Sequence, residues 1–218
     1  MAGRHPNFKP KTTLFFTNFC EASIMKKTIS LILFSFITAA LLATSLQAGI
    51  TFNVTMGGKP LTLTGEPLKI NQPLPDVQLP DTGLGMVNLQ DAFKGKVTIV
   101  SIVPSIDTKV CEKQTHILSE ENKGLDETAR LVTISRDLPF AQKRFANEAN
   151  IHNILFLSDY REATFGKSSG LLIDENRLLA RAVLVLDKDG VIRYMEVVPD
   201  LGQLPDMERA FDTARSLT

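Results

Sequence analysis

The sequence predicts an α/β domain, in which a central mixed β-sheet carries helices on both faces and a β-hairpin stands at the N-terminal end. Two observations support this fold class. Strand-like and helix-like segments alternate through the middle of the chain, and a second hairpin followed by a helix closes it. The 218 residues are 44% hydrophobic and 22% charged, which is ordinary for a globular protein. Residues 49–218 are long enough to form one domain that buries roughly 70% of its unfolded surface.

The first elements are a hairpin and a buried strand. Residues 50–54 and 61–63 alternate apolar and polar side chains around Gly57-Gly58-Lys59, which is a hairpin pattern. Residues 97–103 are largely β-branched and are bounded by a glycine and a proline. They therefore predict a strand that is buried in the sheet.

The remaining elements follow from periodicity and from helix end signals. A polar helical stretch ends at Gly124, and a proline at 139 suits the first position of another helix. The Asp-Lys-Asp-Gly segment at 187–190 is typical of a hairpin turn. In chain order we expect a helix at 111–123, a strand at 131–135, a helix at 139–148, a strand at 154–157, a helix at 162–167, strands at 182–186 and 191–198, and a helix at 205–217.

The N-terminal region has the layout of a secretory signal peptide. In residues 25–48 a methionine and two lysines precede an apolar run at 29–43, and small residues lead to an exit at Ala48. The run is shorter than the roughly 20 residues of a membrane-spanning helix, although an uncleaved N-terminal anchor is the alternative. Residues 1–24 are interpreted as an over-long extension. We therefore expect 49–218 to be exported, to the periplasm if the organism has two membranes.

Charge argues against a nucleic-acid partner. Five of the 24 basic side chains but only one of the 24 acidic side chains lie before residue 49, so the rest of the chain has 19 and 23. A mildly acidic domain with no basic cluster lacks the electrostatic pattern that binds phosphate backbones.

The mature region holds a single cysteine, Cys111. Exported proteins usually pair their cysteines, and here no internal disulfide is possible. Cys111 is therefore either a small buried hydrophobe or a thiol in use. The second cysteine of the chain, Cys20, lies in the extension, and we do not expect it to reach a site in the mature domain.

The neighbours of Cys111 favour a reactive thiol. Cys111 follows the strand at 97–103 and lies in the first turn of the next helix, where unpaired N–H groups and the helix dipole stabilise an anion. Thr108, three residues earlier, can reach the sulfur or cap the helix. Pro104 offers no N–H and can shield the sulfur from water. Lys109 is expected to point to solvent.

The spacing Pro104-x-x-x-Thr108-x-x-Cys111 resembles the active-site motif of the peroxiredoxins, and in particular the loop of bacterial thiol peroxidases. Asp-Leu-Pro-Phe-Ala-Gln at 137–142, followed by Arg-Phe, is similar to the start of the helix that carries their resolving cysteine. Residues 180–183 resemble the strand that supplies their active-site arginine. The resemblance covers about residues 50–217 and implies a thioredoxin-like fold with an N-terminal hairpin.

The resemblance also implies residue roles. Cys111 would be the peroxidatic nucleophile, and Thr108 would hydrogen-bond both its sulfur and the peroxide. Arg181, which read alone could be a surface ion-pair partner, would favour the thiolate and hold the peroxide oxygens. Pro104 would shield the sulfur, and backbone N–H groups near Val110 and Cys111 would complete the pocket. The implied substrates are hydrogen peroxide and organic hydroperoxides, reduced without a cofactor by a homodimer that pairs beside the active site.

The sequence departs from the thiol peroxidases at Ala146, where the resolving cysteine usually stands. A Cys111 sulfenic acid would therefore need an external thiol, from a thioredoxin-like protein or glutathione, and would be exposed to over-oxidation. The alternative function is a peroxide-responsive redox sensor, or a thiol-capture module, that forms mixed disulfides through Cys111.

Other chemistry finds little support in the sequence. His116 lies five positions after Cys111, about 140° around the helix, and so should not face the thiol. His152 has no obvious path to the site. With one mature cysteine and no ligand spacing, we expect no metal centre and no cofactor.

Overall fold

A computed structural model of the chain describes residues 52–218. The expected signal peptide, the extension before it and Cys20 lie outside the described residues. No helix within 52–218 has the length and apolar character needed to cross a membrane.

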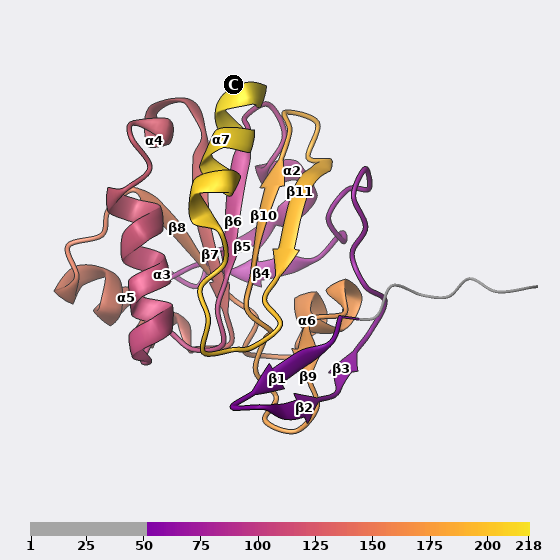
Figure 1. The fold of residues 1–218 in the computed structure, drawn as a ribbon. Helices are drawn as coiled ribbons and strands as arrows, with labels where there is room; N and C mark the ends of the chain where they lie inside the picture. Colours follow the sequence, from indigo (N-terminus) through magenta and orange to yellow (C-terminus); the bar gives the residue numbers. More distant parts are fainter. Residues whose placement is uncertain (1–51) are drawn as a thin grey trace, which may run out of the picture. The chain divides into compact units, whose positions relative to one another are not determined.

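The centre of the domain is a five-stranded mixed sheet in the order β11-β10-β6-β7-β8 (Figure 1). Its parallel half consists of β6 (Thr98–Ile102), β7 (Arg130–Ser135) and β8 (Ile154–Ser158). β10 (Ala182–Leu186) runs antiparallel to β6, and β11 (Ile192–Val197) closes the edge against β10. The expected mixed sheet is confirmed, with β10 at the predicted bounds.

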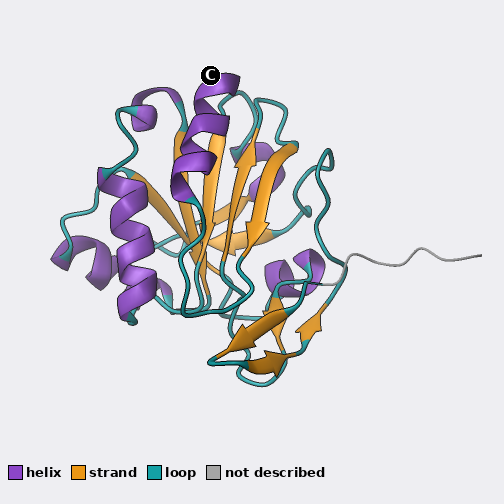
Figure 2. Ribbon diagram, viewed as in Figure 1, coloured by secondary structure: helices purple, strands orange, loops and turns teal. Residues whose placement is uncertain are grey.

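Helices cover both faces of this sheet because successive side chains of a strand point in opposite directions (Figure 2). In β6, Val100 and Ile102 pack in one core cluster with Phe165 of α6 (Thr164–Ser169). Ile99, the residue before Val100, belongs to the opposite cluster. That cluster includes residues of α3 (Lys109–Glu120), α4 (Leu125–Thr128), α5 (Pro139–Glu148) and α7 (Met207–Leu217).

The N-terminal hairpin is tighter than expected. It pairs β1 (Val54–Met56) with β2 (Lys59–Leu61), and Met56 lies opposite Lys59. The turn is therefore Gly57-Gly58 alone, and the expected strands at 50–54 and 61–63 with Lys59 in the turn were wrong in their bounds. The reason is local: the two glycines adopt φ of 57° and 78°, so they supply both positive φ angles of a two-residue turn.

Several short elements were not expected from the sequence. β3 (Leu63–Thr64) pairs with β9 (Leu172–Ile173), and β4 (Gln78–Pro80) pairs with β5 (Met86–Asn88), which leads into α2 (Leu89–Ala92). These strands of two or three residues are too short to show a sequence period, and β3 and β9 pair although they lie far apart in the sequence.

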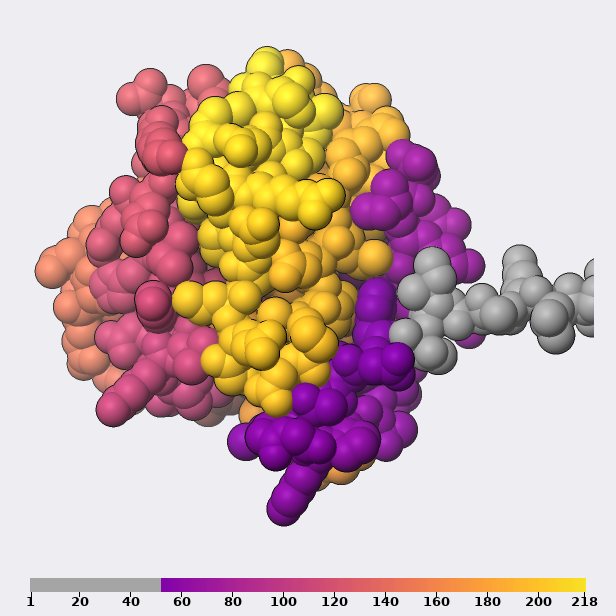
Figure 3. All heavy atoms as spheres, viewed as in Figure 1, coloured from indigo at the N-terminus to yellow at the C-terminus, as the bar shows by residue number. Residues whose placement is uncertain are grey.

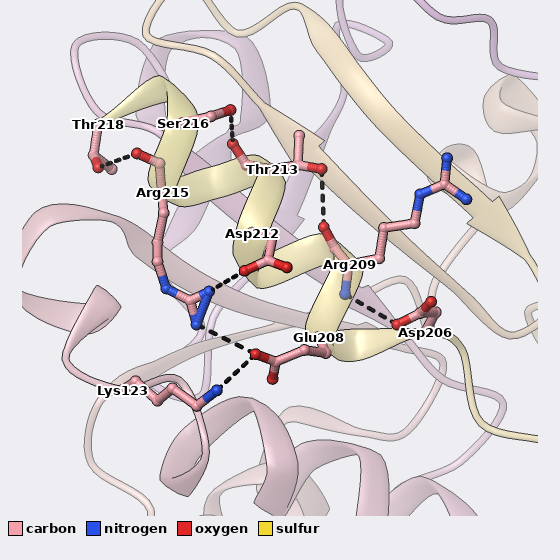
Figure 4. Close-up of polar contacts among 9 residues, drawn as sticks. All are labelled: Lys123, Asp206, Glu208, Arg209, Asp212, Thr213, Arg215, Ser216 and Thr218. Atoms are coloured by element: carbon pink, nitrogen blue, oxygen red, sulfur yellow. Dashed lines mark hydrogen bonds and ion pairs between the residues drawn. The ribbon is translucent and has the colours of Figure 1, made fainter.

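Two helices differ by a few residues from their expected bounds. α3 begins at Lys109, two residues before the expected start, and ends at Glu120 instead of residue 123. α7 begins at Met207 because the Asp206 side chain accepts a hydrogen bond from the Arg209 N–H at 3.0 Å, as Figure 4 shows. In the same view Glu208 pairs with Lys123 at 2.6 Å, which joins α7 to the segment after α3.

Candidate active site

Cys111 is the third residue of α3 and its side chain is 0% exposed. It is a free thiol, packed in a small apolar cluster with Val103, Ile106 and the partly buried Phe145. Phe145 comes from α5, so the sulfur lies between the end of β6, the loop that follows it and a neighbouring helix. The expected position in the first turn of a helix is confirmed.

Thr108 occupies the N-cap position of α3, with extended backbone angles. Its hydroxyl makes no capping hydrogen bond to the helix. The Thr108 Oγ1 lies 3.0 Å from Cys111 Sγ and 3.1 Å from the Ser105 carbonyl oxygen. A hydroxyl has one proton, so Thr108 can donate to the sulfur or to the carbonyl. The sulfur contact is the stronger of the two when the sulfur is ionised.

Arg181 immediately precedes β10 and is only 2% exposed, so it is not a surface ion-pair partner. Its Nη2 lies 3.3 Å from Cys111 Sγ. The Leu201 carbonyl accepts from Arg181 Nε at 3.0 Å and from Nη2 at 2.9 Å, and the Gln114 Oε1 accepts from Nη1 at 2.8 Å. Thr108, at the end of the loop before α3, and Arg181, directly before β10, therefore both contact the sulfur.

The positive charge of Arg181 is buried among neutral hydrogen-bond partners. Among the ion pairs of residues 52–218, none involves Arg181. Its other partners, the Gln114 amide and the Leu201 carbonyl, are neutral. A buried cation is costly unless an anion balances it, and the group in contact that can become an anion is the Cys111 thiol. The arrangement thus places a buried positive charge against the Cys111 sulfur.

The other predicted pocket residues lie around the same turn. Pro104 is buried two residues after the end of β6. Val110 is half-buried in the first turn of α3, where backbone N–H groups have no partner within the helix. Lys109 is exposed, as expected.

Two positioning residues were missed by sequence reasoning. Gln114, fully buried one helical turn after Cys111, holds Arg181 and donates to Ser101 Oγ at 2.8 Å. Its spacing of three from Cys111 on one helix face could have revealed it. The Asp137 carboxylate accepts from Ser105 Oγ at 2.7 Å and from the Ile106 N–H at 2.8 Å, which fixes the loop before Cys111.

The remaining candidates lie apart from the sulfur contacts. His116 pairs with Glu120 at 2.5 Å and meets the Phe145 ring edge-on. His152 is exposed. Ala146 is a partly buried residue of α5. It packs against the core cluster that contains Ile99 and residues of α3 and α7. Within residues 52–218, no group of three or more His, Cys, Asp or Glu side chains is placed to hold a metal ion.

Taken together, the site can stabilise negative charge at one buried point. A buried sulfur meets two donors, one of them a buried guanidinium fixed by three further hydrogen bonds. Donors held in place before reaction stabilise developing charge without the cost of reorganisation. This geometry suits a thiolate that attacks a small molecule whose leaving atom is an oxygen.

Comparison with known proteins agrees with this chemistry. A family model described as Redoxin matches residues 69–211. A thiol peroxidase of Streptococcus pneumoniae is 44% identical over 164 residues, which are 75% of this chain and 99% of that protein. A thiol peroxidase of Bacillus subtilis is 42% identical over 164 residues, 75% of this chain and 97% of that protein. A solved peroxiredoxin-like protein of Aquifex aeolicus superposes with a TM-score of 0.70 at 33% identity, over 77% of this chain and 98% of that one.

Proposed function

The chain belongs to the redoxin family and is a thiol peroxidase, and we propose that it works by a one-cysteine cycle centred on Cys111. The observation that carries the proposal is the buried Arg181 guanidinium, whose one ionisable hydrogen-bond partner within residues 52–218 is the Cys111 sulfur. The intact Thr108 and Arg181 contacts favour turnover over the alternative of a redox sensor, since a thiol that only captures partners has no need of both.

The proposed chemistry starts with the Cys111 thiolate. Its sulfur attacks one oxygen of the hydroperoxide, so an S–O bond forms as the O–O bond breaks. Arg181 and Thr108 stabilise the charge on the departing oxygen, which takes a proton and leaves as water or an alcohol. Cys111 becomes a sulfenic acid. An external thiol then forms a mixed disulfide and releases water, and a second thiol frees Cys111 as the external pair becomes a disulfide.

The absence of a cysteine at Ala146 supports an external reductant. We propose a thioredoxin-like protein or a small thiol such as glutathione in this role. Because Cys111 is 0% exposed, a bulky reductant needs the first turn of α3 to open, whereas a small peroxide needs only a narrow path.

The experiment that tests this cycle is intact mass spectrometry of the reduced protein after one equivalent of peroxide. We expect the mass of one added oxygen on Cys111, removed when a reducing thiol is added, and no loss of two hydrogens. An unchanged mass after peroxide, or an oxygen elsewhere than Cys111, would overturn the one-cysteine cycle.

Export and pairing are further parts of the proposal. The signal-like residues 25–48 support export, to the periplasm where two membranes exist, and the mass of the secreted protein would locate the cleavage site.

A homodimer is supported by Leu138 and Phe140, which are 52% and 64% exposed at the start of α5, next to the Asp137 carboxylate that holds the Cys111 loop. Sedimentation of the secreted protein tests this pairing.

A further inference from the structure

The N-terminal hairpin contacts the segment that holds Arg181. Thr55 of β1 donates from its N–H to the Pro199 carbonyl at 2.8 Å, and its own carbonyl accepts from the Leu201 N–H at 2.9 Å. A parallel bridge joins Thr55 to Asp200. Figure 3 shows this contact from outside: the indigo atoms of the hairpin lie against yellow and gold atoms from the last part of the chain.

Side chains strengthen the same contact. The Thr55 hydroxyl lies 2.9 Å from an Asp200 carboxylate oxygen and 3.0 Å from the Pro199 carbonyl. The other Asp200 oxygen accepts from the Gly202 N–H at 2.8 Å. The pKa of the Asp200 carboxyl lies below its ordinary value because of the Gly202 bond first and the Thr55 bond second, with smaller effects from the turn amides of Gly58 and Gly57.

One peptide unit links Asp200 to the active site. The Gly202 N–H and the Leu201 carbonyl belong to the same peptide bond, and they point in opposite directions because a trans peptide is planar. Holding the N–H against Asp200 therefore aims the carbonyl at Arg181, which donates to it from Nε at 3.0 Å and from Nη2 at 2.9 Å. The same Nη2 contacts Cys111 Sγ.

We propose that Thr55 and Asp200 are positioning residues for the peroxidase reaction, which act through the Leu201–Gly202 peptide to orient the Arg181 guanidinium on the Cys111 sulfur. This inference rests on the proposed function. It assigns the hairpin a role in the chemistry: without Thr55 and Asp200, the Leu201–Gly202 peptide can rotate, and Arg181 loses the acceptor that holds two of its N–H groups.

The test compares Thr55→Val with Thr64→Val. Both changes replace a threonine hydroxyl that donates to an aspartate, since Thr64 Oγ1 lies 2.5 Å from an Asp174 oxygen, but Thr64 in β3 has no bond to the segment at 199–202. We expect Thr55→Val to lower the second-order rate constant with hydrogen peroxide about five-fold, and Asp200→Ala about ten-fold, equivalent to about 1.4 kcal/mol. Thr64→Val should change this rate constant by less than about two-fold. Thr55→Ser keeps the hydroxyl and should react about as fast as the unchanged protein.

A second readout separates this proposal from the peroxidase function itself. Iodoacetamide alkylates Cys111 as a thiolate and involves no peroxide, so its pH profile reports the influence of Arg181 on the sulfur even if peroxide is not the substrate. We expect Thr55→Val and Asp200→Ala to move that profile to higher pH, and Thr64→Val to leave it in place. In an Arg181→Ala background, Thr55→Val should have no further effect on either rate.

Two results would overturn the proposal. In one, Thr55→Val and Thr64→Val slow the reaction equally, which indicates general destabilisation. In the other, Thr55→Val still changes the alkylation profile after Arg181 has been removed, so that its effect does not pass through the guanidinium.

Discussion

Replacement of Arg181 by alanine separates two roles of the guanidinium that the geometry combines. Arg181 Nη2 lies 3.3 Å from Cys111 Sγ, so it can both favour the thiolate and stabilise the oxygen that departs from the peroxide. An ordinary cysteine thiol, with a pKa of about 8.5, is roughly 3% ionised at pH 7. Complete ionisation can therefore raise the reactive fraction by only about thirty-fold, or about 2 kcal/mol of barrier.

Stabilisation of the leaving oxygen adds a separate factor. Removal of one fixed donor from an oxyanion site usually costs about a hundred-fold to a thousand-fold in rate. For Arg181→Ala we therefore expect the rate constant with peroxide at pH 7 to fall by about a thousand-fold or more, whereas alkylation by iodoacetamide falls by no more than about thirty-fold.

The assay is rapid mixing with peroxide beside alkylation, both followed from neutral to alkaline pH. Once pH is high enough to ionise Cys111 in both proteins, the alkylation rates should converge, and the peroxide rate of the variant should stay about a hundred-fold or more below that of the unchanged protein. Circular dichroism checks that the fold survives the loss of a buried side chain. If the peroxide rates also converge at high pH, Arg181 acts only on ionisation and the transition-state role is wrong.

Four further predictions concern single residues. Thr108→Val should lower the peroxide rate constant about ten- to a hundred-fold, because a hydrogen bond to a charged sulfur contributes about 1.5–3 kcal/mol, and equal rates in stopped-flow traces would remove Thr108 from the mechanism. Ala146→Cys should allow a peroxide-dependent internal disulfide, seen as a loss of two hydrogens by mass, and a purely sulfenic product would show that position 146 cannot reach Cys111. The contribution of the Asp200 carboxylate to stability should be present above its ordinary pKa of 3.8 and disappear as the pH falls through its lower folded-state pKa, so the difference between the unchanged protein and Asp200→Ala in urea unfolding should vanish in strong acid; a constant difference contradicts this. Phe140→Glu should turn a dimer into a monomer in sedimentation, and an unchanged mass would place any pairing elsewhere.

The sequence predicted the central sheet, and the place of Cys111 in the first turn of a helix, because both follow short-range rules. The β-branched run at 97–103 and the proline at 139 gave β6 and α5 nearly residue by residue. Thr108, three residues before Cys111, was expected to reach the sulfur, and the distance of 3.0 Å between Thr108 Oγ1 and Cys111 Sγ agrees with it.

The parts that sequence reasoning missed depend on long-range backbone contacts. The Leu201 carbonyl is an acceptor that every residue type possesses, so no side-chain pattern could select it. The contact of Thr55 with Asp200 joins residues 145 positions apart, through a hairpin whose strands have three residues each. Arg181 was placed only through the resemblance, because a lone arginine before a buried strand carries no local signal of what it faces.

Counted consumption of hydrogen peroxide tests the central claim most directly. The reduced protein should consume one equivalent of peroxide without a thiol, and many equivalents when dithiothreitol or a thioredoxin-like reductant is added. Cys111→Ser should consume none under either condition. Consumption that persists in Cys111→Ser, or that stops at one equivalent in the presence of every thiol, would contradict a peroxidase cycle that runs on the Cys111 thiolate and an external reductant.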